Sequence, residues 1–133
     1  MKVKFNLKAD TPNINGTVYP KKELKRAIKE FKKRIKEGNI FGTLKQPIQP
    51  NFSLVDVAFN LIKLTEEDEN FVGDIIILST PQGKILKEIL DDPERFRIVT
   101  LSHGEITKDK DGNNIVNNLE IEAVGIEPKD NCA

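Results

Sequence analysis

The chain has 133 residues, 38% of them hydrophobic, and its 21 Lys and Arg residues balance 21 Asp and Glu residues. This size predicts one globular domain over residues 1–133, and zero net charge gives no reason to expect binding to nucleic acid or membranes through bulk electrostatics. No stretch approaches the roughly 18 consecutive apolar residues of a membrane helix, and the amino terminus lacks the apolar segment of a signal peptide, so we expect a cytosolic product. The charge is uneven along the sequence, because residues 1–38 hold 12 basic and 4 acidic residues.

The first third of the chain predicts a strand, a loop and a helix. Residues 2–7 alternate polar and apolar side chains, which is typical of a half-buried strand. A loop follows, up to Pro20. Residues 21–37 then place apolar side chains at helical spacing, with Pro20 before them and Gly38 after them, which predicts a helix. Its apolar stripe consists of Leu24, Ala27, Ile28, Phe31 and Ile35.

The rest of the chain predicts several strands and a second helix. Residues 53–64 and 71–78 predict a hairpin around an acidic turn at 66–70. Thr80 is a candidate N-cap for a helix that begins at Pro81 and ends before Pro93. The other extended segments are residues 40–44, 96–101, a short piece at Ile106, and 119–126. This order favours an α+β fold with two main helices and a curled antiparallel or mixed β-sheet, or a small barrel.

Four short motifs, in order along the chain, resemble those of the phage prohead (capsid maturation) serine proteases. They are Asn-Ile-Asn-Gly-Thr-Val-Tyr-Pro at residues 13–20, Gly-Thr-Leu-Lys-Gln-Pro at 42–47, Thr-Pro-Gln-Gly-Lys-Ile at 80–85 and Leu-Ser-His-Gly at 101–104. Together they span most of the chain. The resemblance implies a herpesvirus/prohead-protease-like fold, with the general base in the second motif and the nucleophile in the fourth.

The positions that the resemblance assigns to catalysis depart from the family pattern. The second motif of the family is Gly-x-Leu-x-His-Pro, and Gln46 stands at its histidine. A carboxamide has no lone pair basic enough to activate a serine hydroxyl near neutral pH. A further histidine of the family falls at Phe59, and His103 stands where the resemblance places an arginine, next to the candidate nucleophile Ser102. We therefore interpret Gln46, Phe59, Ser102 and His103 as a degenerate site and expect no catalytic residues.

His103 is the only histidine in the chain. Consecutive side chains of a strand point to opposite faces, so an imidazole at this position is poorly placed to take the proton of Ser102. An unusual turn would change this geometry. The enzyme question therefore stays open at this point, with the inactive reading favoured.

The segment around residue 111 shares part of the spacing of a calcium-binding loop. Acidic and amide side chains fall at five of the positions that an EF-hand uses, but the required glycine is displaced by two positions and flanking helices are absent. These side chains are Asp109, Asp111, Asn113, Asn117 and Glu120. Asp111-Gly112 between extended segments instead predicts a hairpin turn. No Cys/His cluster or glycine-rich phosphate loop is present, so we expect neither a metal nor a cofactor.

The leading hypothesis is a catalytically silent relative of the prohead proteases that serves as an auxiliary or decoration protein of a phage capsid. Its expected partners are the major capsid protein and neighbouring copies in the head, with no membrane and no specific nucleic acid, and its expected location is the virion, after assembly in the host cytoplasm. An active maturation protease that uses Ser102, and an internal scaffold or head protein, remain as alternatives. The candidate capsid-binding residues are Lys25, Lys29, Lys32, Lys33, Glu66 and Glu67.

Overall fold

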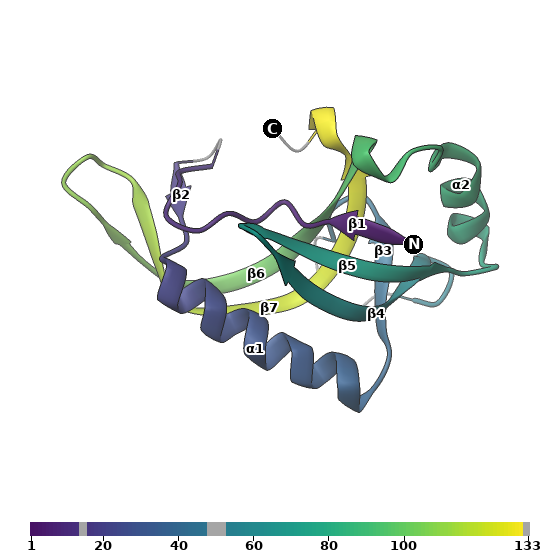
Figure 1. Ribbon diagram of the computed structural model, residues 1–133, viewed down its shortest axis with the longest axis horizontal. Helices are drawn as coiled ribbons and strands as arrows, with labels where there is room; N and C mark the ends of the chain where they lie inside the picture. The colour runs from purple at the N-terminus through teal and green to yellow at the C-terminus, as the bar shows by residue number, and fades with distance from the viewer. Residues whose placement is uncertain (14–15, 48–52, 132–133) are drawn as a thin grey trace.

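A curled, mixed β-sheet carries two α-helices in the computed structural model, which describes residues 1–13, 16–47 and 53–131 (Figure 1). In chain order the elements are β1 (Lys2–Lys4), β2 (Thr17–Val18), α1 (Lys21–Glu37), β3 (Ile40–Leu44), β4 (Val57–Glu67), β5 (Asn70–Ile77), α2 (Pro81–Ile89), β6 (Phe96–Lys108) and β7 (Asn114–Pro128), with short 3-10 helices at Pro93–Arg95 and Lys129–Asn131. This is the α+β architecture with two main helices that the sequence predicts.

The seven strands form one sheet in the order β1-β5-β4-β3-β7-β2, and β6 pairs with β7. The pairs β3–β7 and β2–β7 are parallel, and the remaining pairs are antiparallel. Strand β7 therefore joins both halves of the sheet, because β3, β2 and β6 all pair with it. Figure 1 shows the long β6–β7 pair curving away from the β4–β5 hairpin.

Both predicted helices are confirmed. Helix α1 has the predicted bounds, and it buries Leu24, Ala27, Ile28 and Phe31. Helix α2 begins after Thr80, whose hydroxyl oxygen accepts a hydrogen bond from the Gly83 amide at 3.0 Å, as expected of an N-cap. Local signals are sufficient for these two elements, since the periodicity and the capping residues lie within each helix.

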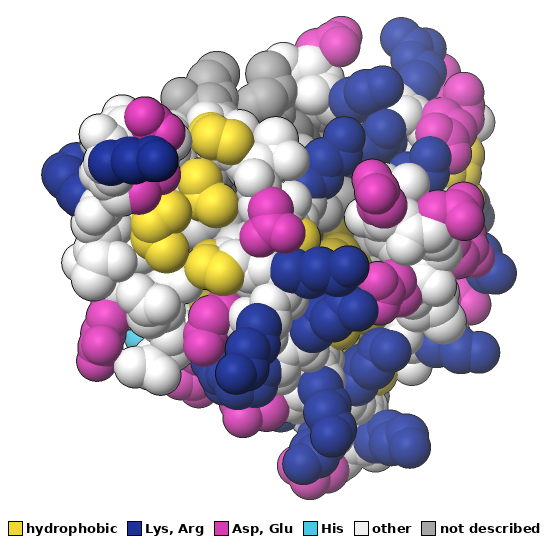
Figure 2. Space-filling view, turned by 60° about the vertical axis from the view of Figure 1, so that its left-hand side comes forward, with side chains coloured by type: hydrophobic (Ala, Val, Ile, Leu, Met, Phe, Trp, Pro, Cys, Tyr) yellow, Lys and Arg dark blue, Asp and Glu magenta, His cyan; other side chains and the backbone are white. Residues whose placement is uncertain are grey.

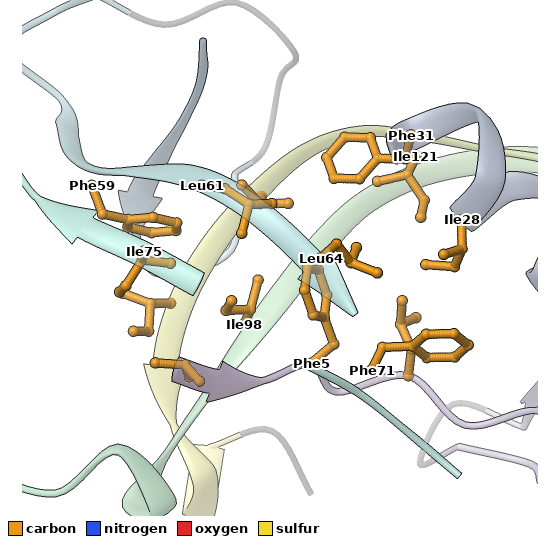
Figure 3. Close-up of a cluster of buried hydrophobic side chains, with 14 of the residues drawn as sticks. Phe5, Ile28, Phe31, Phe59, Leu61, Leu64, Phe71, Ile75, Ile98 and Ile121 are labelled. Carbon is orange, nitrogen blue, oxygen red and sulfur yellow. The ribbon is translucent and has the colours of Figure 1, made fainter. Parts of the chain in front are cut away.

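The core lies between α1 and the concave side of the sheet. Phenylalanine side chains from the segment after β1, from α1, β4 and β5 are all at most 4% exposed. In Figure 3, Ile28 and Phe31 of α1 point toward Leu64 and Phe71 of the β4–β5 hairpin. Burial of this apolar surface is the main force that holds the helix against the sheet.

Several predicted strand limits are wrong, and local irregularity explains the largest error. Residues 96–108 form one strand where the sequence predicted two pieces, and the register of β6–β7 shifts at Leu101/Ser102 and at His103/Glu105. Asn118 of β7 has a positive φ of 53°. Such bulges interrupt the alternation of polar and apolar residues from which a strand is predicted, so β7 was expected only from residue 119.

The other differences are smaller. Residues 53–56 precede β4 instead of belonging to it. The acidic turn, predicted at 66–70, consists only of Asp68 and Glu69, and Asp68 has a φ of 55°. Strand β1 ends at Lys4, although Phe5 and Asn6 still donate backbone hydrogen bonds to Phe71 and Ile98. The two-residue strand β2 was not predicted. Residues 14–15 of the first motif lie outside the described residues.

Candidate functional site

The second sequence motif leaves the end of β3 and crosses toward β6. Lys45, with a φ of 69°, donates its amide to the Ile126 carbonyl at 2.9 Å, which extends the parallel pairing with β7 by one residue. The Gln46 side-chain amide then donates to the carbonyl oxygen of Thr100 at 2.9 Å. Gln46, which the sequence comparison placed at the motif histidine, therefore contacts β6 at Thr100, two residues before Ser102.

Gly125 makes this crossing possible. A Cβ atom at Gly125 would lie 2.0 Å from the carbonyl oxygen of Lys45 and 3.0 Å from Cδ of Pro47. Only a glycine lets the chain pass this close over β7. Gly125 was not predicted as a site residue. A glycine inside a strand pattern is the sequence signal that could have indicated it, because such a glycine often marks a close approach of another backbone.

Phe59 is part of the core and not part of an open site. It pairs with Gly42 across β3–β4, and its ring lies against that glycine, since a Cβ atom at Gly42 would be 2.0 Å from the ring atom Cζ. The side chain is fully buried. A histidine at this position would have to replace a packed hydrocarbon ring, so the motif glycine and this phenylalanine act together as a packing pair.

Ser102 and His103 both lie on β6, which continues past the predicted strand end at residue 101. Ser102 pairs with Ile121 of β7, and His103 pairs with Glu120. Ser102 is half-buried and His103 is exposed. Within the part of the chain that the structure describes, the Ser102 hydroxyl has no hydrogen-bond partner. The successive side chains of this strand leave on opposite faces, so the chain geometry separates the hydroxyl from the imidazole.

Two glutamates of β7 contact the His103 ring. Nδ1 of His103 contacts Oε1 of Glu122 directly, and Nε2 lies 3.3 Å from Oε2 of Glu120. Glu120 and Glu122 are two residues apart on one strand, so their side chains lie on the same face as the imidazole. Both ring nitrogens are thus directed at carboxylates. The sequence did not predict that these two glutamates contact His103, because the contact depends on the register in which β6 pairs with β7.

The basic face of α1 is exposed, and two arginines fix the helix to β7. Arg26 donates to the Leu119 carbonyl at 3.0 Å, and Arg34 donates to the Ile121 carbonyl at 2.6 Å. Arg26 also pairs with Glu23 at 3.0 Å, and this hydrogen bond lowers the pKa of the Glu23 carboxyl below its ordinary value of 4.5. The arginines therefore set the position of the helix, and the lysines are left on its outer side.

The six residues predicted to bind capsid neighbours are all exposed: Lys25, Lys29, Lys32, Lys33, Glu66 and Glu67. Figure 2 shows Lys and Arg side chains gathered over α1. Lys25 and Glu66 line one hollow of about 340 Å³ between the start of α1 and the β4–β5 turn. The basic helix and the acidic turn therefore meet at one end of α1, while Lys29, Lys32 and Lys33 lie further along the helix.

The segment that resembles a calcium loop is a hairpin turn. Oδ1 of Asp109 accepts hydrogen bonds from the amides of Asp111 and Asn113, both at 2.9 Å, and Gly112 has a φ of 81°. The bond from Asn113 holds the pKa of the Asp109 carboxyl below its ordinary value of 3.8. The predicted Asp-Gly turn between β6 and β7 is confirmed. No group of three His, Cys, Asp or Glu side chains among the described residues is arranged to hold a metal ion.

Comparison with known proteins identifies the family. Residues 4–127 match the family described as prohead core protein serine protease. The chain belongs to this family. The structure of the bacteriophage T4 capsid assembly protease, gp21, is similar with a TM-score of 0.79 and 20% sequence identity, over 94% of this chain and 79% of that chain. The resemblance inferred from the four motifs is confirmed, and so is the protease-like fold, a curled mixed sheet with two helices.

Family membership makes this a phage protein with a prohead-protease-like fold and links it to the phage head. The comparison with curated proteins finds no match. Among the helices of the described residues, none is both long and apolar enough to span a membrane.

Proposed function

We propose that this chain is a non-cleaving member of the prohead core protein serine protease family that acts as an auxiliary or decoration protein of the phage head and binds the major capsid protein. The placement of His103 carries the proposal. It is the single imidazole of the chain, and its two ring nitrogens are directed at Glu120 and Glu122. A serine nucleophile needs a base within hydrogen-bond reach of its hydroxyl.

The position of Gln46 supports the same conclusion. Its amide donates a hydrogen bond to the Thr100 carbonyl and so acts as a structural link between the β3 end and β6. A donor held in this way has no function as a proton acceptor for Ser102. The Phe59 ring, which is buried against Gly42, supplies no second base.

The exposed lysines of α1 support a binding role. None of Lys25, Lys29, Lys32 and Lys33 has a carboxylate partner within salt-bridge distance among the described residues. Exposed charges of one sign steer association with a surface of the opposite sign. A protease fold that already contacts head proteins would hold them durably once cleavage is lost, and the expected location is therefore the virion.

Co-expression with the major capsid protein of the same phage tests the proposal. We expect the wild type and Ser102→Ala to co-purify equally with capsid particles and to leave the capsid protein uncut, as measured by intact-mass spectrometry. Detection of the intact chain in mature virions is expected as well. Loss of the chain on maturation would identify an internal scaffold or head protein instead.

An active protease is the second candidate, and one observation favours it. A carboxylate in contact with Nδ1 of a histidine is the arrangement that orients a catalytic base. In that case the wild type would cut the capsid protein or itself, and Ser102→Ala would abolish the cut. That result would overturn the non-cleaving proposal.

A further inference from the structure

The N-terminal segment and β6 form a cationic hollow that lies apart from Gln46 and Ser102 and that shares Lys8 with the hollow at the start of α1. The hollow has a volume of about 570 Å³. Four cationic side chains and one acidic side chain line it: Lys4, Lys8, Arg97, Lys129 and Asp130. These residues come from three distant parts of the sequence, so the concentration of positive charge is a product of the fold.

The backbone that carries two of these lysines is fixed. Phe5 donates its amide to the Phe71 carbonyl and Asn6 donates to the Ile98 carbonyl, both at 2.8 Å, so the segment after β1 is held between β5 and β6 (Figure 1). Phe5 and Leu7 point into the core and are 4% and 6% exposed. Side chains of an extended chain alternate between its two faces. Lys4 precedes Phe5 and Lys8 follows Leu7, so both lysines lie on the outer side.

Arg97 is also held in place. Its Nη1 donates to the carbonyl oxygens of Glu94 at 2.9 Å and Phe96 at 2.7 Å. A guanidinium anchored at one nitrogen keeps further donors in a fixed plane, and this geometry suits a carboxylate. The hollow therefore contains a preorganised donor as well as flexible lysines.

Few of these cations form ion pairs within the described residues. Lys8, Arg97 and Lys129 have no carboxylate within salt-bridge distance among the described residues. Lys4 lies 3.5 Å from Glu94, whose side chain is 67% exposed, and a pair of this kind contributes little. Like charges gathered around one hollow favour an anionic occupant.

We propose that this hollow binds a carboxylate-rich segment of a protein partner. The inference deepens the proposed function, because it gives the chemistry of the head-protein segment that the chain contacts. The shape and composition of the site favour such a segment over nucleic acid. The hollow is small compared with the width of a duplex, Asp130 at its wall would repel a phosphate backbone, and the chain has no net positive charge to attract a polyanion at long range.

Fluorescence anisotropy with a labelled hexaglutamate peptide tests the site on the purified full chain. We expect Lys8→Glu combined with Lys129→Glu to weaken binding by about tenfold or more, because each reversal replaces an attraction with a repulsion. Lys84→Glu combined with Lys87→Glu on α2 is the matched control, with the same change in net charge, and should alter affinity by less than about twofold. Arg97→Lys should weaken binding with little effect on stability, since the planar fork is lost and the charge is kept.

Three results would overturn the proposal. These are equal binding of a hexaglutamine peptide, equal loss of affinity in the α2 control, and tighter binding of a short DNA duplex that depends on Lys8 and Lys129. Circular dichroism of each variant verifies that it is folded. The peptide titration needs no capsid, so the two proposals can fail separately. If the chain does not bind phage particles, only the proposed function is overturned. If the chain binds particles but does not distinguish hexaglutamate from hexaglutamine, only the proposed site is overturned.

Discussion

The carbonyl oxygen of Lys45 occupies the space in which any side chain at Gly125 would begin. Lys45 directly follows β3, Gly125 lies on the neighbouring strand β7, and a Cβ atom at Gly125 would be 2.0 Å from this oxygen. The contact determines how the segment after β3 crosses β7 and where Gln46 meets β6. The place where Gln46 contacts β6 thus depends on one glycine of the last strand.

Gly125→Ala should destabilise the protein. The neighbouring atom belongs to the backbone and cannot rotate away, so the overpacking should cost about 1–3 kcal/mol of the free energy of unfolding. Urea denaturation followed by circular dichroism measures this. Gly38→Ala is the matched control, because no atom lies within 4 Å of a Cβ there, and it should change the free energy of unfolding by less than about 0.5 kcal/mol. Equal effects of the two substitutions would contradict the crossing geometry.

The sequence could predict the elements whose signals are local. Helix α1 was predicted with its observed bounds, and the Thr80 cap was predicted because Thr80 and Pro81 stand next to each other. The β4–β5 hairpin and the Asp111-Gly112 turn were predicted for the same reason. Each of these depends on residues within one short window.

The rest depends on contacts between distant residues. The hydrogen bond from Gln46 to Thr100 joins residues 54 positions apart, and the pairing of His103 with Glu120 follows from bulges in β6–β7 that no local pattern indicates. From the sequence we predicted that Gln46 stands at the histidine position of the family motif. Only the folded chain shows that the amide serves as a link, and only the folded chain gathers Lys8, Arg97 and Lys129 around one hollow.

Gly42 and Phe59 should be energetically coupled. Gly42→Ala alone should cost about 1–3 kcal/mol, because the new methyl group meets the Phe59 ring. In Gly42→Ala/Phe59→Leu the smaller side chain makes room, so the double variant should lose less stability than the two single variants together, with a coupling energy of about 0.5–3 kcal/mol. A double-mutant cycle from urea denaturation measures it.

The control for this cycle combines Gly42→Ala with Leu119→Val, a buried change on β7. Those two losses should add to within about 0.5 kcal/mol. If the losses in the free energy of unfolding are also additive in the Gly42/Phe59 cycle, the Phe59 ring does not pack against Gly42.

The Glu23–Arg26 pair should make the protein more stable above the ordinary pKa of a glutamate. The pKa of Glu23 is lower in the folded chain than its ordinary value of 4.5. Between these two pKa values the unfolded chain binds a proton that the folded chain does not, so stability rises with pH in this range and is lost as the pH falls through the folded pKa. Glu23→Gln should therefore lower stability at neutral pH and lose less stability than the wild type on acidification.

Urea midpoints at neutral pH and at about pH 3.5 test this prediction. Glu88→Gln is a suitable control, since Glu88 is an exposed residue of α2 with no ion-pair partner among the described residues. Its pH profile should follow that of the wild type. Parallel profiles for Glu23→Gln and the wild type would rule out a stabilising role for the pair.

Charge reversal on the outer face of α1 should weaken association with phage particles. Lys29, Lys32 and Lys33 are exposed and have no carboxylate partner among the described residues, so replacing all three with Glu should leave the fold intact. Binding to a negatively charged capsid surface should fall by about tenfold or more, as measured by co-sedimentation with particles. The matched control reverses Lys84, Lys87 and Lys110, which lie on α2 and at the β6–β7 turn, and it should sediment like the wild type. Equal binding of both triple variants would remove α1 from the capsid-binding surface and leave the cationic hollow as the remaining candidate.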